Sequence, residues 1–436
     1  MSKLGESMKR KIIGLTLSIG FLTTFGIYFW RSYVGKNQAY INKAFALARK
    51  MRITPEGKKP NDTADVMKKI ENLIVDYTQE NEIKKTIKNF LYKTMGKKIA
   101  ISDIKQQGGD PQGGLSGNPL FFIRDIEGNL VFVIKVFEKP FDAYENFIKE
   151  LSGFQIASTI KGEKFQLINL QAIGKAIIDQ KPYGLLAISP APGVNIQDLL
   201  IKMFHQDYGT KQRAQAFGIF KKALEKLGIA LSELHHIRTQ RNKQIHASEI
   251  EYGRKQLKDM IKLLDQEKHG INPQELQKCF DFLVDQMKNI KVTRSMVHGD
   301  PHLGNFMYDS KGGTLFMIDL AELSRTLDQE GNPIRSAAPD YMGILDALAF
   351  NKQFGLTEKE YKGLKDAFVN AYGESYNKFS KLEKEFFILG RCLSLASVFL
   401  KVQKAHPEKF TDSIMKGLLQ YQLDRIKESI AKCKTQ

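Results

Sequence analysis

Cysteine is rare in this chain. Among 436 residues there are three, odd in number and widely spaced: Cys279, Cys392 and Cys433. This usage argues against a disulfide framework and against a zinc site, and it favours a reducing compartment. Internal repeats and low-complexity tracts are also absent from the sequence, so no repeat architecture is indicated. The length is sufficient for a small anchor, a connecting region and one sizeable domain.

Acidic residues are outnumbered by basic ones, with 48 Asp and Glu against 66 Lys and Arg, which gives a formal net charge of +18. Such an excess attracts anionic lipid, nucleotide or nucleic acid. The charge is spread along the chain, and the sequence has neither an arginine-rich arm nor a motif that mixes aromatic and basic residues. We therefore expect no specific nucleic-acid partner, and a general role of the charge at a membrane surface or in solubility.

Charge is missing altogether from residues 12–30. As a helix with a rise of 1.5 Å per residue, this run would span about 28 Å, close to the apolar thickness of a bilayer. Basic residues flank the run, and its end, Tyr28-Phe29-Trp30, suits an interfacial aromatic belt. The pattern predicts a single-pass transmembrane anchor. A cleaved signal peptide and a buried core helix are the competing interpretations, but the run is long for a signal and no clean cleavage site follows.

The segment from Val297 to Phe306, together with the apolar run that ends at Asp319, carries the chemistry. Asp300 can accept the proton of an attacking hydroxyl, Asn305 can offer a neutral oxygen to a magnesium ion, and Asp319 can bridge metal and phosphates. This spacing is what phosphoryl transfer from a metal-bound nucleotide requires. The competing interpretation is a simple turn between strands, in which Asp and Asn bond to backbone groups.

His298-Gly299-Asp300, followed by Asn305 and by an apolar strand ending in Asp319, resembles the catalytic core of the aminoglycoside phosphotransferase and choline kinase group. This group is the small-molecule branch of the protein-kinase-like fold. The resemblance implies that Asp300 is the catalytic base, that Asn305 and Asp319 hold Mg²⁺, and that ATP is the phosphate donor. It also implies an α+β fold with two lobes, a small lobe built on an antiparallel sheet and a large lobe that is mainly helical.

Three strands are expected in the small lobe, at 99–107, 120–124 and 130–137. The connection at 108–119 is rich in glycine, which lets backbone N–H groups approach phosphate oxygens. This connection resembles the Gly-Gly-x-Ser-Asn loop of choline and ethanolamine kinases, with Gly117 as an extra residue. The matching positions, which the resemblance assigns to the nucleotide, are Gly113, Gly114, Ser116 and Asn118.

Lys135 lies inside the third of these strands, in an apolar run. Burying a lysine there is costly unless a partner compensates its charge, and the alternative is an edge-strand lysine that extends to water. By resemblance, Lys135 occupies the position that binds the α and β phosphates. Its partner would be a glutamate of the helix expected at 141–156. Glu145 and Glu150 both lie at the margin of the apolar face, and the family's spacing favours Glu150.

A strand at 165–178 and a last small-lobe strand at 183–189 are expected next. Residues 190–193, Pro-Ala-Pro-Gly, cannot continue a strand and suit a hinge between the lobes. The resemblance places the adenine against backbone groups near Ala187 and Ser189.

Helices dominate the predicted large lobe, at 217–236 and through most of 357–432. The first of them ends in His235-His236, which lacks the spacing of a metal site and indicates capping or packing. Asp340 begins another helical region. The resemblance implies that Asp340 braces the catalytic loop, and an N-cap is the alternative.

The resulting domain map has a basic flank at 1–11, an anchor at 12–30, a connecting region at 31–96, a small lobe at 97–189 and a large lobe at 190–436. Within the connecting region, helical pieces are expected at 40–51 and 64–92.

These features predict a membrane-anchored, ATP-dependent phosphotransferase that acts on a hydroxyl of a small molecule or a lipid head group. Basic residues on both sides of the anchor leave its orientation undecided, so the need for ATP places the catalytic domain on the cytoplasmic side. Choline is disfavoured as the acceptor, because a quaternary ammonium prefers an aromatic cage and the one tryptophan, Trp30, lies in the anchor.

Three other functions remain open: an atypical protein kinase, a kinase-like ATPase of isoprenoid biosynthesis, and a non-catalytic nucleotide-binding scaffold. The sequence lacks the Phe-Gly that follows the metal-binding Asp of eukaryotic protein kinases, and it lacks the Lys-x-Gly-Gln signature of the isoprenoid-biosynthesis ATPases. Retention of Lys135, Asp300, Asn305 and Asp319 argues against a scaffold.

Overall fold

The structure is a computed structural model that describes most of the chain. The described residues are 38–39, 41–50, 52, 68–69, 76–80, 82–95, 101–106, 118–138, 147–178, 180–204, 210–352, 355–373, 379–405, 407 and 413–435. The flank and anchor predicted at 1–30, the loop positions Gly113, Gly114 and Ser116, and also Glu145 lie outside these residues, and what was predicted for them stays a prediction. None of the helices described is long and apolar enough to cross a bilayer.

The chain divides into two compact units. Of the described residues, those up to 48, from 64 to 148 and from 169 to 190 form the small unit, and those from 49 to 63, from 149 to 168 and from 191 onward form the large unit. Described residues of the region predicted at 31–96 count with both units: those up to 48 and from 68 onward count with the small unit, and residues 49, 50 and 52 count with the large unit.

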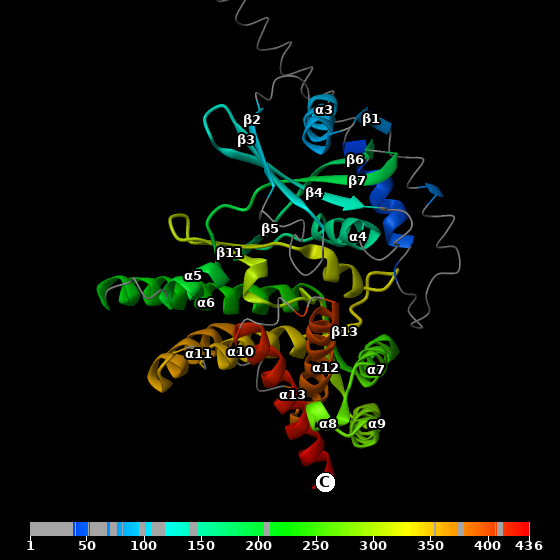
Figure 1. The fold of residues 1–436 in the computed structure, drawn as a ribbon, viewed down its shortest axis with the longest axis vertical. Helices are drawn as coiled ribbons and strands as arrows, with labels where there is room; N and C mark the ends of the chain where they lie inside the picture. The colour runs from blue at the N-terminus through cyan, green and yellow to red at the C-terminus, as the bar shows by residue number, and fades with distance from the viewer. Residues whose placement is uncertain are drawn as a thin grey trace, which may run out of the picture. The chain divides into compact units, whose positions relative to one another are not determined.

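A six-stranded sheet forms most of the small unit, in the order β1-β6-β7-β4-β3-β2. Its strands are β1 (Asp76–Glu80), β2 (Ile101–Gln106), β3 (Leu120–Asp125), β4 (Leu130–Glu138), β6 (Leu170–Ile178) and β7 (Lys181–Ile188). Neighbouring strands are antiparallel except β1 and β6, which are parallel. Helix α3 (Ile83–Met95) packs on this sheet (Figure 1), and Phe90 lies so close to Gly174 of β6 that a Cβ there would overlap the ring.

The strands predicted at 99–107, 120–124, 130–137 and 183–189 are confirmed as β2, β3, β4 and β7, with ends that shift by one to a few residues. These segments pair mainly with near neighbours along the chain, and the hairpin of β3 and β4 is local. Short-range pattern was therefore enough to find them.

Two predictions for this part of the chain are wrong. The helix predicted at 64–92 contains strand β1, which pairs with β6 far along the sequence, and only then helix α3. The strand predicted at 165–178 is two strands, β5 (Phe165–Leu167) and β6, which pair in different sheets. In both cases the deciding partner is remote in sequence, and local propensity does not reveal such a partner.

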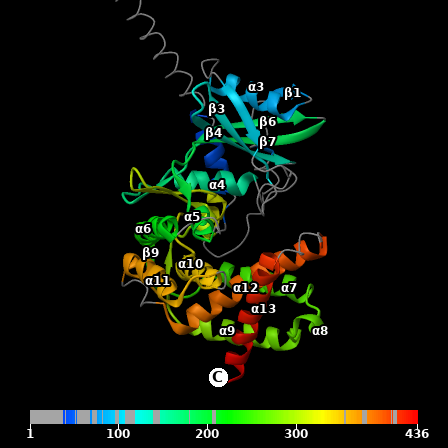
Figure 2. The same ribbon diagram turned by 60° about the vertical axis from the view of Figure 1, so that its left-hand side comes forward.

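The large unit is mainly helical (Figure 2). Its helices are α4 (Phe147–Ala157, of which the first two residues count with the small unit), α5 (Ile196–Met203), α6 (Thr210–Ile237), α7 (Ala247–Ile261), α8 (Gln266–His269), α9 (Pro273–Asn289), α10 (Ala338–Asn351), α11 (Glu358–Tyr372), α12 (Lys381–Ala405) and α13 (Ser413–Lys434). The helices predicted at 217–236 and within 357–432 are thereby confirmed.

Two small sheets complete the large unit. One has the order β5-β12-β11-β8, with β8 (Val194–Asn195), β11 (Phe306–Asp309) and β12 (Thr314–Met317), and the other has the order β13-β10-β9, with β9 (Thr239–Lys243), β10 (Val292–Ser295) and β13 (Arg335–Ser336). A hydrophobic core of the unit lies among α7, α9, α12 and α13. It includes the fully buried side chains of Met260, Phe280, Leu389, Leu393 and Ile426.

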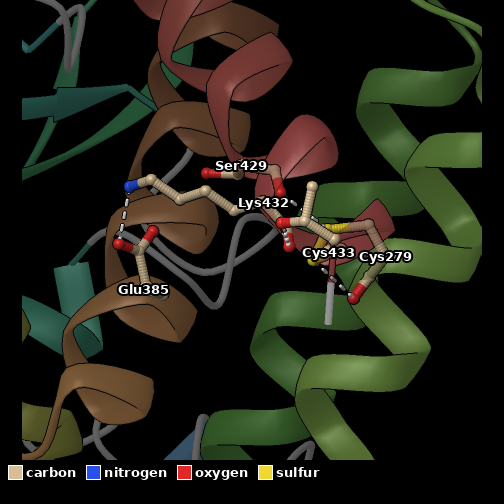
Figure 3. The surroundings of a disulfide bond; sticks show 6 residues. Cys279, Glu385, Ser429, Lys432 and Cys433 are labelled. Atoms are coloured by element: carbon tan, nitrogen blue, oxygen red, sulfur yellow. Dashed lines mark hydrogen bonds and ion pairs between the residues drawn. A yellow bond between two sulfur atoms is a disulfide. The ribbon is translucent and has the colours of Figure 1, made fainter.

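A disulfide joins Cys279 of α9 to Cys433 near the end of α13, with a Cα–Cα distance of 5.5 Å (Figure 3). Beside the disulfide, Lys432 forms an ion pair of 2.7 Å with Glu385 of α12. The expectation that the cysteines form no disulfide is wrong for this pair, and the inference of a reducing compartment loses that support. The wide spacing of the two residues in sequence does not keep them apart once α9 and α13 pack together. Cys392 is buried and carries a free thiol.

Candidate active site

The catalytic loop follows β10 and leads into a short 3₁₀ helix at Leu303–Asn305. Gly299 has a φ of +85°, and a Cβ at this position would lie 2.8 Å from the Cβ of Glu322. Both the left-handed backbone and the close packing therefore favour glycine. The next side chain, Asp300, is 43% exposed, so a small acceptor can reach its carboxylate from the surface of the large unit.

Asn305 is buried and holds Asp300 in place. Its side-chain Nδ2 donates to the backbone carbonyl of Asp300 at 3.0 Å and to Oδ2 of the Asp300 carboxylate at 3.1 Å. Because the nitrogen end of the amide is used in this way, the oxygen end is the part of Asn305 that can act as a ligand for a hard cation. The structure thus brings together two of the three residues that the sequence predicted.

Asp319 lies two residues beyond the end of β12, in the left-handed backbone region with φ 54° and ψ 67°. Aspartate adopts this conformation more readily than most residues, although it is strained for any side chain with a Cβ. The preceding residue fixes this bend from both sides. The N–H of Ile318 donates to the carbonyl of Asn305 at 2.9 Å, and the Ile318 carbonyl lies 3.0 Å from Nε2 of His298. Asp319 is therefore tied to the catalytic loop through the backbone.

Asp340 braces the catalytic loop from the first turn of α10, where it is completely buried. Its carboxylate accepts the N–H groups of His298 at 2.6 Å and of Gly299 at 2.9 Å. Burial alone would raise the pKa of this carboxyl, but the hydrogen bond and charge of His235 and the nearby backbone donors outweigh burial and hold the pKa below its usual range. The N-cap alternative is wrong, because Ala337 is the N-cap of α10.

His235 connects this brace to α11. Its Nε2 lies 3.1 Å from Oδ2 of Asp340, and its Nδ1 lies 2.7 Å from the hydroxyl of Tyr372. Since a carboxylate can only accept, the Nε2–H of His235 donates to Asp340, and Nδ1 shares the second hydrogen bond with the hydroxyl of Tyr372. The packing role predicted for the paired histidines is confirmed for His235. Tyr372 was not predicted, and no local sequence signal distinguishes it from other core tyrosines.

Helix α4 fixes the segment that follows Asp319. A Cβ at Gly153 of α4 would overlap the backbone carbonyl of Leu320, so the two backbones are in close contact. Lys149 of the same helix forms an ion pair with Glu322, which also lies 3.4 Å from Arg325. Burial raises the pKa of the Glu322 carboxyl, but these two cations outweigh it and the pKa falls below its usual range. Sequence reasoning missed all of these contacts.

His302 is a further polar group beside the base. Its Nδ1 accepts the backbone N–H of Gly304 at 3.1 Å, so the ring hydrogen sits on Nε2, which lies 3.7 Å from Oδ2 of Asp300. The side chain is about half exposed and stands where an acceptor would approach Asp300. Its position in the motif, two residues after the base, was the available signal.

The nucleotide-binding residues predicted for the small unit can be described only within that unit. Lys135 is buried on β4, which pairs with β3 on one side and with β7 on the other, so the edge-strand alternative is wrong. Ala187 is buried on β7. The N–H of Ser189 donates to the carbonyl of Asn169 at 2.9 Å, and the adenine contact predicted near Ala187 and Ser189 stays a prediction. Asn118 is partly buried just before β3.

Glu150, the predicted partner of Lys135, is buried on α4. Its assignment to Lys135 stays a prediction, as does the choice between Glu150 and Glu145.

A magnesium site can be tested against the chemistry of its proposed ligands. Mg²⁺ in phosphate-transferring enzymes is held by one or two protein oxygens together with substrate phosphates and water, and it needs no complete protein cage. One amide oxygen from Asn305 and one carboxylate from Asp319 fit this requirement. Within the described part of the chain, no group of three or more His, Cys, Asp or Glu residues is arranged to hold a metal by itself.

Comparison with known proteins agrees with this site. Residues 209–325 match the family described as "Phosphotransferase enzyme family" (APH). Among solved structures, a Plasmodium vivax ethanolamine kinase matches with a TM-score of 0.42 and 14% identity over 87% of this chain and 97% of its own. A glucosamine kinase matches with a TM-score of 0.41 and 9% identity, over 75% of this chain and 95% of its own. A glucosamine kinase in complex with glucosamine, ADP and inorganic phosphate matches with a TM-score of 0.38 and 10% identity, over 75% of this chain and 94% of its own. No curated protein matches the sequence.

The matched family segment begins just before α6 and ends with the residues that follow Asp319, so it contains the whole catalytic loop. The family match covers this catalytic segment and not the rest of the chain. The resemblance to the aminoglycoside phosphotransferase and choline kinase group is thereby confirmed for the segment that carries the catalytic motif.

Proposed function

We propose that this enzyme transfers the γ-phosphate of Mg²⁺-ATP to a hydroxyl group of a small molecule or a lipid head group. Asp300 acts as the base, and Asn305 and Asp319 would hold the metal. The observation that carries the proposal is the pair of hydrogen bonds from Asn305 Nδ2 to Asp300, because they join base and metal ligand in one rigid element.

The roles follow from what each group can do. The exposed carboxylate of Asp300 orients the acceptor hydroxyl and takes its proton as the new P–O bond forms and the bond between the γ-phosphorus and ADP breaks, with ADP as the leaving group. Asp340 holds the two backbone N–H groups that precede Asp300 and so fixes the position of the base. When bound, Mg²⁺ would neutralise part of the negative charge of the ATP phosphates. A non-catalytic scaffold would not need a base that is both fixed by its neighbours and open to solvent.

Asp319→Asn tests the metal assignment. The substitution removes the only carboxylate of the proposed metal pair, so turnover should fall by about 10²-fold or more and Mg²⁺-ATP should bind more weakly. Affinity for ATP without magnesium should change little. Calorimetry with and without magnesium measures both affinities, and Asp281→Asn, an exposed change on α9, serves as the control. Unchanged Mg²⁺-ATP affinity in a folded Asp319→Asn protein would remove Asp319 from the site.

We also propose that residues 12–30 anchor the enzyme in a membrane, with the kinase units on the ATP-containing side. The uncharged run of a length close to the bilayer's apolar thickness supports this proposal. After a carbonate wash, the full chain should remain with the membrane pellet, and a chain that starts at Lys36 should be in the supernatant. If both partition alike, the anchor assignment fails.

A further inference from the structure

A basic pocket lies in the large unit, between the end of α7, helix α8, the end of α12 and the start of α13. Its volume is about 580 Å³, which is within the range of small-ligand sites. The polar residues of its lining that matter here are Lys262, Asp265, Lys268, His269, Lys404 and Lys416. None of them belongs to the catalytic loop or to the residues that brace it.

His269, which lines this pocket, carries a buried hydrogen-bond donor. The side chain is 8% exposed, and its Nδ1 accepts the backbone N–H of Asp265 at 3.0 Å. The ring hydrogen must therefore lie on Nε2. Nε2 is buried and has no hydrogen-bond partner among the described residues. A buried donor without an acceptor destabilises the folded protein by its desolvation free energy. A ligand whose oxygens accept this hydrogen bond would offset that cost.

The four lysines around the pocket make it strongly positive. In the part of the chain that the structure describes, no carboxylate forms an ion pair with Lys262, Lys268, Lys404 or Lys416. Asp265, the acidic member of the lining, uses Oδ1 to accept the N–H of Lys268 and so caps α8. Repulsion among the four ammonium groups is therefore relieved mainly by solvent and counterions.

Favourable interaction with helix dipoles explains the positions of only some of these lysines. Lys262 caps the C-terminus of α7 and Lys404 lies in the last turn of α12, where cations are favoured. Lys416 lies in the first turn of α13, where the dipole disfavours a cation. The convergence of these lysines on one cavity thus calls for an anion in the pocket.

We propose that the basic pocket binds a phosphate-bearing anion, at a site separate from the nucleotide and acceptor sites of the kinase. The phosphate oxygens would accept the hydrogen of His269 Nε2 and the ammonium hydrogens of the lysines that line the pocket. A phosphate suits this set because its oxygens accept several charge-assisted hydrogen bonds at once. The phosphate group can come from a soluble phosphorylated compound or from a lipid head group, and both sources present the same chemistry.

The test uses the full chain and two probes, inorganic pyrophosphate and dihexanoyl phosphatidic acid below its micellar concentration, each titrated by calorimetry without magnesium. The variant is Lys404→Glu with Lys416→Glu. Its control is Lys278→Glu with Lys291→Glu, which makes the same change of net charge at two exposed lysines outside the pocket lining. Dihexanoyl phosphatidylcholine, whose phosphate is monoanionic and shielded by a quaternary ammonium, is the control for the lipid probe.

The pocket variant should bind one or both phosphate probes at least about tenfold more weakly than the wild type, while the control variant stays within about twofold. Loss of pyrophosphate binding alone identifies a soluble ligand, and loss of phosphatidic acid binding alone identifies a lipid. Should the melting temperature of the pocket variant fall without ligand, Lys404→Gln with Lys416→Gln replaces it. The proposal is overturned if the wild type binds neither probe, or if binding is equal in the pocket and control variants. Phosphate transfer by the active site is independent of either result.

Discussion

Replacing Asp300 with asparagine should reduce phosphate transfer by about 10²-fold or more and leave the affinity for ATP nearly unchanged. In the proposed mechanism the carboxylate acts on the acceptor hydroxyl and not on the nucleotide, so its loss should affect the chemical step and leave nucleotide binding intact. An asparagine oxygen can still accept the 3.1 Å hydrogen bond from Asn305 Nδ2, so the loop should keep its conformation.

Nucleotide affinity by calorimetry and phosphate transfer or slow ATP hydrolysis by radiolabel should be measured on the same preparations. Asp281→Asn, which makes the same chemical change at an exposed position, should behave as the wild type. Wild-type turnover in Asp300→Asn would rule out Asp300 as the base.

Asp340→Asn should cost both stability and activity. The carboxylate of Asp340 accepts from two backbone N–H groups and from His235, and an asparagine cannot accept all three, because one end of its amide is itself a donor. We expect a loss of about 2–4 kcal/mol in the free energy of unfolding. Turnover should fall as well, since the two N–H groups belong to the residues that precede the base, while the KM for ATP should change less.

Tyr372→Phe removes one hydrogen bond, that of the Tyr372 hydroxyl with His235. It should lower the free energy of unfolding by only about 1 kcal/mol.

The stability difference between Asp340→Asn and the wild type should depend on pH in a defined direction. The pKa of Asp340 is depressed in the folded protein, so the carboxylate contributes its full stability above the unfolded-state pKa of about 4. This contribution is lost as the pH falls from there toward the folded-state pKa. Denaturant unfolding should therefore show a constant difference above about pH 5 and a shrinking one in more acid solution. A difference that persists unchanged in acid would contradict the role given to the charge of Asp340.

The fold was predictable where a segment's partner is close in sequence. The hairpin of β3 and β4 and the long helix α6 were found from local pattern alone, because turn residues and apolar periodicity determine them. β1 was missed because only β6, far along the chain, makes it a strand. The disulfide of Cys279 and Cys433 was missed for the same reason, since it depends on the packing of α9 against α13.

In the candidate active site, too, the residues of a local motif were predictable and the contacts with remote segments were not. Asp300, Asn305 and Asp319 form one short motif whose spacing encodes its chemistry, and the structure ties them together through hydrogen bonds. The contact of Gly153 with Leu320 and the ion pair of Lys149 with Glu322 join α4 to a segment remote in sequence. Such supporting contacts have no local signature, although they hold the segment that directly follows Asp319.

Transfer of radiolabelled γ-phosphate from ATP to a pool of hydroxyl-bearing metabolites and lipid head groups tests the central claim most directly. With magnesium present, the wild-type chain should produce at least one labelled phosphomonoester that is stable to chromatography. Asp300→Asn should produce about 10²-fold less of it, and Asp281→Asn should produce as much as the wild type. The contradicting result is a folded wild-type chain that binds Mg²⁺-ATP and neither hydrolyses it nor labels any acceptor, because that behaviour belongs to a nucleotide-binding scaffold and not to a kinase.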